Sequence, residues 1–166
     1  YYKIKPTKFH IKMGTLGKAY GSYGAYILAS KQIINFLINR AKPIIYSTAP
    51  SLFDTALALE SLNFIIENKQ TLKEKITGHL NIIQDILGID SKSLIIPIEI
   101  ADNKKVKDIQ EILKQKGYLV GAIRQPTVKS AIIRLIAKID VDKNDLIKVC
   151  NLLKDSNVNK WLNKRQ

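Results

Sequence analysis

Cysteine is almost missing from this chain of 166 residues, and that scarcity excludes two kinds of site. One cysteine, Cys150, can form neither a disulfide within the chain nor a cysteine metal cluster. It shares a helical apolar spacing with Leu146, Val149 and Leu153, which favours a position in a core. A core cysteine with no disulfide partner is typical of a reducing compartment.

Histidines and long apolar runs are equally scarce. His10 and His79 are far apart and have no carboxylate at ligand spacing, so we expect no metal site. No uninterrupted apolar run reaches the about 18 residues of a membrane span, and the first residues lack the apolar region of a signal peptide. We therefore expect a soluble, cytoplasmic protein without a membrane partner.

Acidic residues are few, because 14 Asp and Glu stand against 27 Lys and Arg, giving a net charge of +13. Such a charge suits nucleic acid, a membrane surface or an anionic substrate. The basic residues are spread along the chain and no nucleic-acid motif accompanies them, so we expect no nucleic-acid partner. A basic, non-catalytic binding module remains an alternative reading of the charge.

Short apolar segments alternate with helical spacings, which predicts an α/β fold. Residues 9–13 alternate like a strand, 25–29 indicate a buried strand, and 44–46 indicate another extended segment, in a βαβ-like order. Helices are expected after Ser30, after Pro50 and from about Gln70 to Gly88. Further on, the pattern gives strand 94–100, helix 106–116, strands 118–123 and 131–139, and helix 143–153. We place a domain boundary near residue 70, which divides the chain into 1–70 and 71–166, and the chain without an initiator Met is expected to start inside a larger protein.

The most informative stretch is residues 14–24, GTLGKAYGSYG, where Lys18 stands among small residues just after a strand. A phosphate-binding P-loop would need a glycine at Lys12 and a serine or threonine at Ala19, so that motif is excluded. The glycines do not follow the dinucleotide-binding spacing either. Taken without further context, Lys18 could equally be a solvated lysine in a glycine-rich turn.

Residues 15–24 match the pyridoxal-phosphate attachment signature, and the chain therefore resembles the class II aminotransferases and their relatives. The resemblance implies that Lys18 bonds covalently to the aldehyde of pyridoxal 5'-phosphate and later acts as a base. It also implies that Thr15 hydrogen-bonds the cofactor phosphate. The implied fold is the remainder of a PLP-transferase fold type I large domain over 1–70, followed by a small C-terminal α+β domain over 71–166.

Two other stretches narrow the resemblance to the α-oxoamine synthases. Residues 44–49, IIYSTA, resemble the segment that these enzymes extend to the neighbouring subunit's cofactor phosphate, which implies a homodimer with Ser47 and Thr48 serving the partner's site. Residues 122–128, AIRQPTV, resemble a segment of the 8-amino-7-oxononanoate synthases. There Arg124 would bind the amino-acid carboxylate through its guanidinium fork, and Thr127 would lie beside the acyl substrate.

The implied reaction is a decarboxylative condensation of L-alanine with a pimeloyl thioester, carried by CoA or by acyl carrier protein, in biotin synthesis. Gln125, Lys129 and Ser130 depart from the family segment, which bears on the acyl substrate more than on the cofactor. Glycine C-acetyltransferase, 5-aminolevulinate synthase and serine palmitoyltransferase stay open as alternatives, because they share the lysine segment and the chemistry. The resemblance begins midway through the family's sequence. The family's histidine that stacks on the cofactor ring and its aspartate that pairs with the ring nitrogen belong to the upstream half. The 166 residues therefore contain only part of the expected site.

Overall fold

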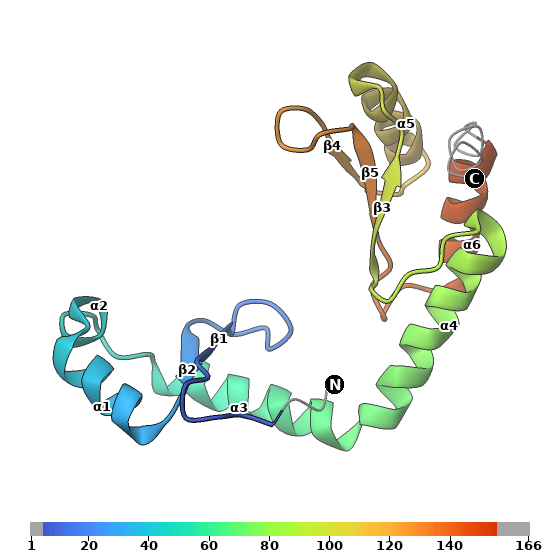
Figure 1. Cartoon of the computed structure of the whole chain (residues 1–166). Helices are drawn as coiled ribbons and strands as arrows, with labels where there is room; N and C mark the ends of the chain where they lie inside the picture. The colour runs from blue at the N-terminus through green and yellow to red at the C-terminus, as the bar shows by residue number, and fades with distance from the viewer. Residues whose placement is uncertain (1–4, 156–166) are drawn as a thin grey trace. The chain divides into compact units, whose positions relative to one another are not determined.

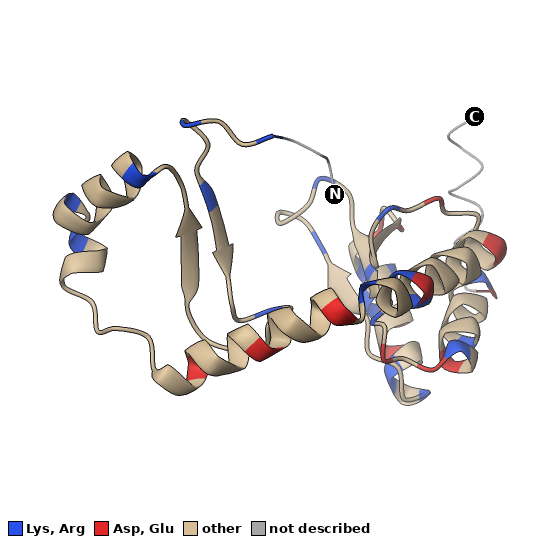
Figure 2. Cartoon of the chain, turned by 90° about the horizontal axis from the view of Figure 1, so that it is seen from below, with Lys and Arg blue, Asp and Glu red and all other residues tan. Residues whose placement is uncertain are grey.

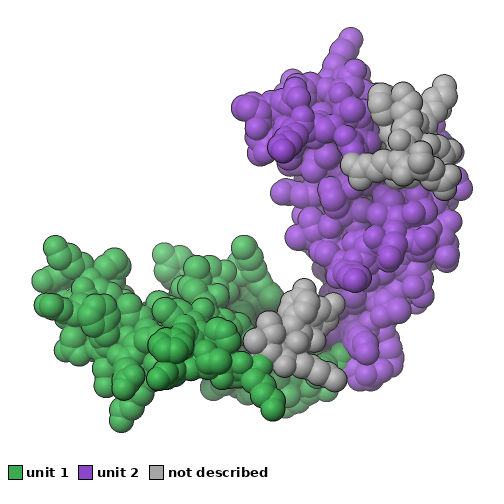
Figure 3. All heavy atoms as spheres, viewed as in Figure 1, with its two compact units in different colours: residues 1–69 green, residues 70–166 purple. Residues whose placement is uncertain are grey.

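The computed structural model of the chain describes residues 5–155, which form two compact units (Figures 1 and 3). Unit 1 covers residues 1–69 and unit 2 covers residues 70–166. Each unit has its own sheet and its own helices, so each is treated by itself.

Unit 1 begins with an antiparallel hairpin of strands β1 (Lys12–Thr15) and β2 (Ala25–Leu28). The helices α1 (Lys31–Arg40), α2 (Lys42–Ile45) and α3 (Leu52–Glu67) follow. Helix α3 has a well-made start, because the side chain of its N-cap Ser51 accepts a hydrogen bond from the backbone N–H of Asp54 at 3.0 Å. The hairpin loop and this helix start are the parts of unit 1 on which the candidate site depends.

Four sequence expectations for unit 1 are wrong. Residues 42–45 form a helix rather than an extended segment, because Pro43 stands in the first helical turn, where its missing N–H costs nothing. The first two strands pair antiparallel as a hairpin, so the βαβ-like order does not hold. The first strand starts at Lys12 rather than at Phe9, and the second strand is exposed at Ile27 and Leu28 instead of buried.

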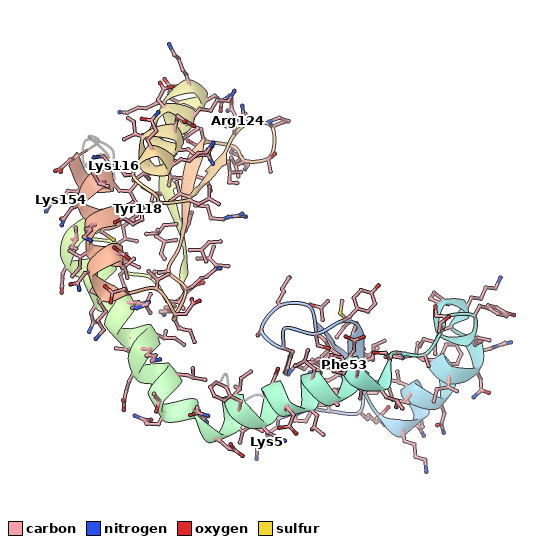
Figure 4. All side chains as sticks on the ribbon, turned by 180° about the vertical axis from the view of Figure 1, so that it is seen from behind. Lys5, Phe53, Lys116, Tyr118, Arg124 and Lys154 are labelled. Atoms are coloured by element: carbon pink, nitrogen blue, oxygen red, sulfur yellow. The ribbon has the colours of Figure 1, made fainter. Side chains whose placement is uncertain are left out.

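Unit 1 has almost no core of its own. Among its described residues Ala58 is the one buried apolar side chain, whereas Leu52 is 89% exposed and Phe53 is 78% exposed. Figure 4 labels Phe53 on α3. Helix α3 carries apolar residues around its whole circumference, a pattern typical of a helix that is covered on every side. Unit 1 by itself therefore leaves its hydrophobic side chains in water.

Unit 2 combines helix α4 (Lys69–Leu87, whose first residue is the last of unit 1) with a three-stranded antiparallel sheet and two more helices. The strands are β3 (Ile95–Glu99), β4 (Gly121–Ile123) and β5 (Ile132–Ile136), in the spatial order β3, β5, β4. The helices are α5 (Asn103–Gln115) and α6 (Lys143–Leu153). Each of these elements overlaps the range expected from the sequence, and Gly88 ends α4 with a positive φ of 70°.

The core of unit 2 lies on one face of this sheet. Alternate residues of β3 and β5 are buried while their neighbours face outward, and α4, α5 and α6 supply the opposite layer. The largest fully buried side chains are Ile83, Ile96, Ile98, Ile100, Leu113, Ile133 and Leu153. This is a two-layer α+β arrangement with a continuous hydrophobic interior. Within residues 5–155 no helix is long and apolar enough to cross a membrane.

Cys150 lies in this core, as its spacing predicts, and it has no exposed surface. Burial raises the pKa of its thiol to about 11, so the reactive thiolate is scarce at pH 8. We expect iodoacetamide to leave Cys150 unmodified at pH 8 until denaturant unfolds unit 2, as measured by intact mass. Rapid labelling of the native protein would contradict this placement.

Candidate active site

Lys18 stands in a tight turn between the two strands of unit 1. Thr15 is the last residue of β1 and pairs with Ala25 across the hairpin. The backbone N–H of Gly21 donates to the Lys18 carbonyl at 3.0 Å, which closes a four-residue turn over 18–21. Thr15 and Lys18 are both exposed, so the structure brings a hydroxyl and a primary amine to the same end of one hairpin.

Glycines shape this hairpin for two different reasons. A Cβ on Gly14 would lie 2.5 Å from ring atoms of Tyr26, its cross-strand partner, so the tyrosine ring occupies the space of a side chain. Gly21 adopts a φ of +59°, which L residues rarely adopt, and a Cβ there would meet no atom within 4 Å. The side of the turn at Gly21 is thus open to an incoming group.

Ser47 and Thr48 are exposed and lie together on an open cavity of about 890 Å³ in unit 1. Residues 23–25, at the end of the Lys18 loop, line the same cavity, together with 43–44 and 47–51. Within this unit the structure therefore places the two predicted hydroxyls beside the segment that leads out of the lysine turn.

The residues of unit 1 fit pyridoxal phosphate. Lys18 is exposed in a turn that also has open space at Gly21, and a covalent bond to an aldehyde requires such an accessible primary amine. Hydroxyls at Thr15, Ser47 and Thr48 are donors suited to phosphate oxygens. The three acidic residues of unit 1, Asp54, Glu60 and Glu67, all belong to α3, which carries the red segments of this unit in Figure 2. Nothing in residues 5–51 opposes the negative charge of a phosphate.

Arg124 and Thr127 lie on one loop of unit 2, between β4 and β5. Figure 4 labels Arg124 on this loop. Both side chains are exposed. Gln125 closes the loop, because its side-chain amide donates to the Lys129 carbonyl at 2.7 Å and its backbone N–H donates to Asn103 Oδ1 at 3.3 Å. A proline at 125 could make neither bond, so this departure from the family segment has a structural consequence.

Asn103 belongs to the first turn of α5, and that turn is fixed by Asp102. The Asp102 carboxylate accepts backbone hydrogen bonds from Lys105 at 2.9 Å and Lys104 at 2.7 Å, which lower the pKa of Asp102. A lowered pKa means that this cap contributes stability above the ordinary pKa of aspartate and loses it as the pH falls through the lowered value. At neutral pH the charged Asp102 carboxylate therefore caps the start of α5, and Asn103 in that first turn accepts the hydrogen bond from the Arg124 loop.

Sequence reasoning missed the residues that hold the Lys18 loop in place. Ser61 Oγ donates to the Tyr20 carbonyl at 2.8 Å, and Ser22 Oγ donates to the Asp54 carbonyl at 2.6 Å. Ser61 stands between Glu60 and Leu62, with Asn63 next along α3, so its polarity does not set it apart from its neighbours. Ser22 matches no defined position of the signature, so no local pattern marks it.

Comparison with known proteins gives curated relatives that are 8-amino-7-oxononanoate synthases. The Helicobacter pylori J99 protein is 42% identical over 155 residues, which cover 93% of this chain and 42% of the relative. The Maricaulis maris protein is 36% identical over 126 residues, which cover 75% of this chain and 32% of the relative. The chain thus spans less than half the length of either curated relative.

Solved structures show the same fold at low sequence identity. The Francisella tularensis 8-amino-7-oxononanoate synthase matches with a TM-score of 0.74 and 22% identity over 91% of this chain and 46% of that chain. The Sphingomonas wittichii serine palmitoyltransferase matches with a TM-score of 0.74 and 14% identity over 92% of this chain and 40% of that chain. The expected fold class, part of a type I PLP-transferase, is confirmed.

The statistical model of one protein family, aminotransferase class I and II, matches residues 4–153. That range includes the Lys18 turn of unit 1 and the Arg124 loop of unit 2. This match covers nearly the whole chain, and it agrees with the attachment signature and with the fold. The chain belongs to the aminotransferase class I and II family, whose members depend on pyridoxal phosphate.

Proposed function

We propose that the complete protein is an 8-amino-7-oxononanoate synthase, which condenses L-alanine with a pimeloyl thioester and releases CO₂. The observation that carries the proposal is the exposed Lys18 turn with its complete attachment signature, in a chain 42% identical to a synthase of that name. The AIRQPTV segment at Arg124 supports the same assignment.

We also propose what each unit and its partners contribute. Unit 1 is the C-terminal part of the cofactor-binding large domain, and unit 2 is the small C-terminal domain. The complete protein works as a cytoplasmic homodimer, in which Ser47 and Thr48 serve the cofactor phosphate of the neighbouring subunit. The open cavity that these two hydroxyls line supports this role.

In the proposed reaction the cofactor, when bound, withdraws electrons from the α-carbon of the amino acid. Lys18 Nζ holds the cofactor covalently before the substrate arrives and then accepts the α-proton. Thr15 Oγ1 donates to the phosphate. Arg124 binds the substrate carboxylate with two parallel N–H bonds, and Thr127, on the same loop, lies beside the acyl group.

The proposal is tested by absorbance spectroscopy of the complete protein purified with pyridoxal phosphate. We expect a cofactor band that L-alanine perturbs more strongly than glycine or L-serine, and CO₂ release that needs both L-alanine and pimeloyl-CoA or pimeloyl-acyl carrier protein. A response to glycine or serine alone would assign another α-oxoamine synthase. Absence of any cofactor band would contradict the proposal and favour a basic binding module.

Arg124→Lys is expected to raise the KM for L-alanine about 10- to 100-fold, while the KM for the pimeloyl thioester stays nearly constant. Lysine keeps the charge but loses the two-point fork, and hydrogen bonds to charged groups are worth about 1.5–3 kcal/mol. Lys129→Ala is the matched control, because it removes an exposed positive charge from the same loop. An unchanged KM in Arg124→Lys together with a raised KM in Lys129→Ala would show that net charge, rather than guanidinium geometry, binds the carboxylate.

A further inference from the structure

Backbone hydrogen bonds within the Lys18 turn account for only part of its order. Ser22 N–H donates to the Leu16 carbonyl at 3.0 Å, and Leu16 N–H donates to the Gly24 carbonyl at 2.9 Å. Together with the Gly21 to Lys18 bond, these contacts close the loop but do not fix its direction relative to the rest of unit 1. Its direction depends on contacts with another element.

That element is α3, which meets the loop through two serine hydroxyls. Ser61 on the helix donates to the Tyr20 carbonyl, two residues after Lys18, at 2.8 Å. Ser22 on the loop donates to the Asp54 carbonyl, in the first turn of the helix, at 2.6 Å. Both hydrogen bonds are partly buried, so water competes with them less than at an exposed site.

The spacing on α3 allows both contacts at once. Asp54 and Ser61 are seven residues apart, which is about two helical turns, so they share one face. Ala58 lies between them on that face and is the buried residue of α3, 9% exposed. Its small side chain lets the loop approach the helix closely. The two hydroxyls therefore hold the loop against one face of α3, at Asp54 and at Ser61.

The first turn of α3 is itself held firmly. Ser51 Oγ accepts from Asp54 N–H at 3.0 Å and donates to the Asp54 carboxylate at 2.6 Å, and Thr55 Oγ1 donates to the Ser51 carbonyl at 2.9 Å. Ser51 also lines the cavity that contains Ser47 and Thr48. The same capped helix start thus accepts a hydrogen bond from the lysine loop and lines the cavity of the two hydroxyls.

We propose that Ser22 and Ser61 are positioning residues for Lys18: they fix the lysine turn on α3 and so set the place of Nζ for covalent bonding to the cofactor. The role of Lys18 rests on the proposed function. Neither serine touches the reacting atoms, and each acts through the backbone of residues 20–22 and the first turn of α3.

The test compares Ser61→Ala, Ser22→Ala and the double variant in the complete protein, with Ser30→Ala as the matched control. Ser30 is the N-cap of α1 but makes no side-chain cap bond, so its replacement removes a hydroxyl without removing such a contact. The first readout is amide hydrogen exchange of residues 16–24 in the cofactor-free protein. The second is the dissociation constant of pyridoxal phosphate and the yield of its borohydride fixation on Lys18.

We expect each single replacement to speed exchange of the 16–24 peptide about tenfold and to weaken cofactor binding about tenfold, the size of one lost hydrogen bond. Ser61→Thr, which keeps the hydroxyl, should restore both values, and Ser30→Ala should change neither. Unchanged exchange over 16–24 would overturn the proposal, as would faster exchange spread evenly through unit 1, which indicates a purely structural role. If the wild-type protein binds no cofactor at Lys18, the proposed function fails, while the exchange data still decide whether the serines fix the turn.

Discussion

Lys18→Ala in the complete protein is expected to abolish the covalent link to pyridoxal phosphate entirely. Borohydride would then reduce no cofactor onto the protein, and peptide mapping would find residues 13–31 unmodified, whereas in the wild type the added mass falls on Lys18. The α-proton acceptor is lost with the same amine, and positioned acid–base groups contribute about 10²–10⁴-fold to rates. We therefore expect kcat to fall at least about 10³-fold.

Lys12→Ala is the matched control for this experiment. Lys12 is an exposed lysine on β1, at the other end of the same four-residue strand from Thr15, and it stands outside the turn. Its replacement should leave the covalent link and the absorbance band unchanged. Retention of a reducible link in Lys18→Ala, or its loss in Lys12→Ala, would sink the assignment of the reactive lysine.

The sequence predicts the parts of the molecule that depend on local spacing. In unit 2 the apolar segments predict the strands β3 and β5, and the helical spacing around Cys150 predicts both helix α6 and its buried face. The lysine turn is also local, since Thr15, Lys18 and the glycines lie within ten residues. These features can be read from neighbours in the chain.

Contacts between distant residues could not be predicted in this way. The bond from Ser61 to Tyr20 joins residues 41 positions apart, and the bond from Gln125 to Asn103 joins residues 22 apart. The segment 42–45 is too short, and too apolar, for the spacing of its residues to distinguish a strand from a helix. It forms a helix with Pro43 in the first turn, a position that proline favours. The exposure of β2 also has a non-local cause, because a strand is buried only when another layer covers it.

Residues 70–166 are expected to fold alone, whereas residues 1–69 are not. Unit 2 contains 17 of the 18 buried apolar residues of the described chain in one cluster, and unit 1 contains only Ala58. A domain of this size should unfold in one cooperative transition with an enthalpy of about 60–80 kcal/mol at its midpoint. Calorimetry and circular dichroism of the two separate fragments measure this difference directly.

Alanine substitutions at two adjacent residues of α5 then test whether the described core stabilises the isolated unit 2. Leu113 is 1% exposed and Ile112 is 48% exposed, although both are large aliphatic residues on the same helix. Leu113→Ala should lower the free energy of unfolding by about 2–5 kcal/mol, because it leaves a cavity, whereas Ile112→Ala should change it by less than about 1 kcal/mol. Similar losses for both variants, or no cooperative transition in residues 70–166, would show that this core depends on contacts from outside unit 2. A cooperative transition in residues 1–69 alone would show that burial in unit 1 does not limit its folding.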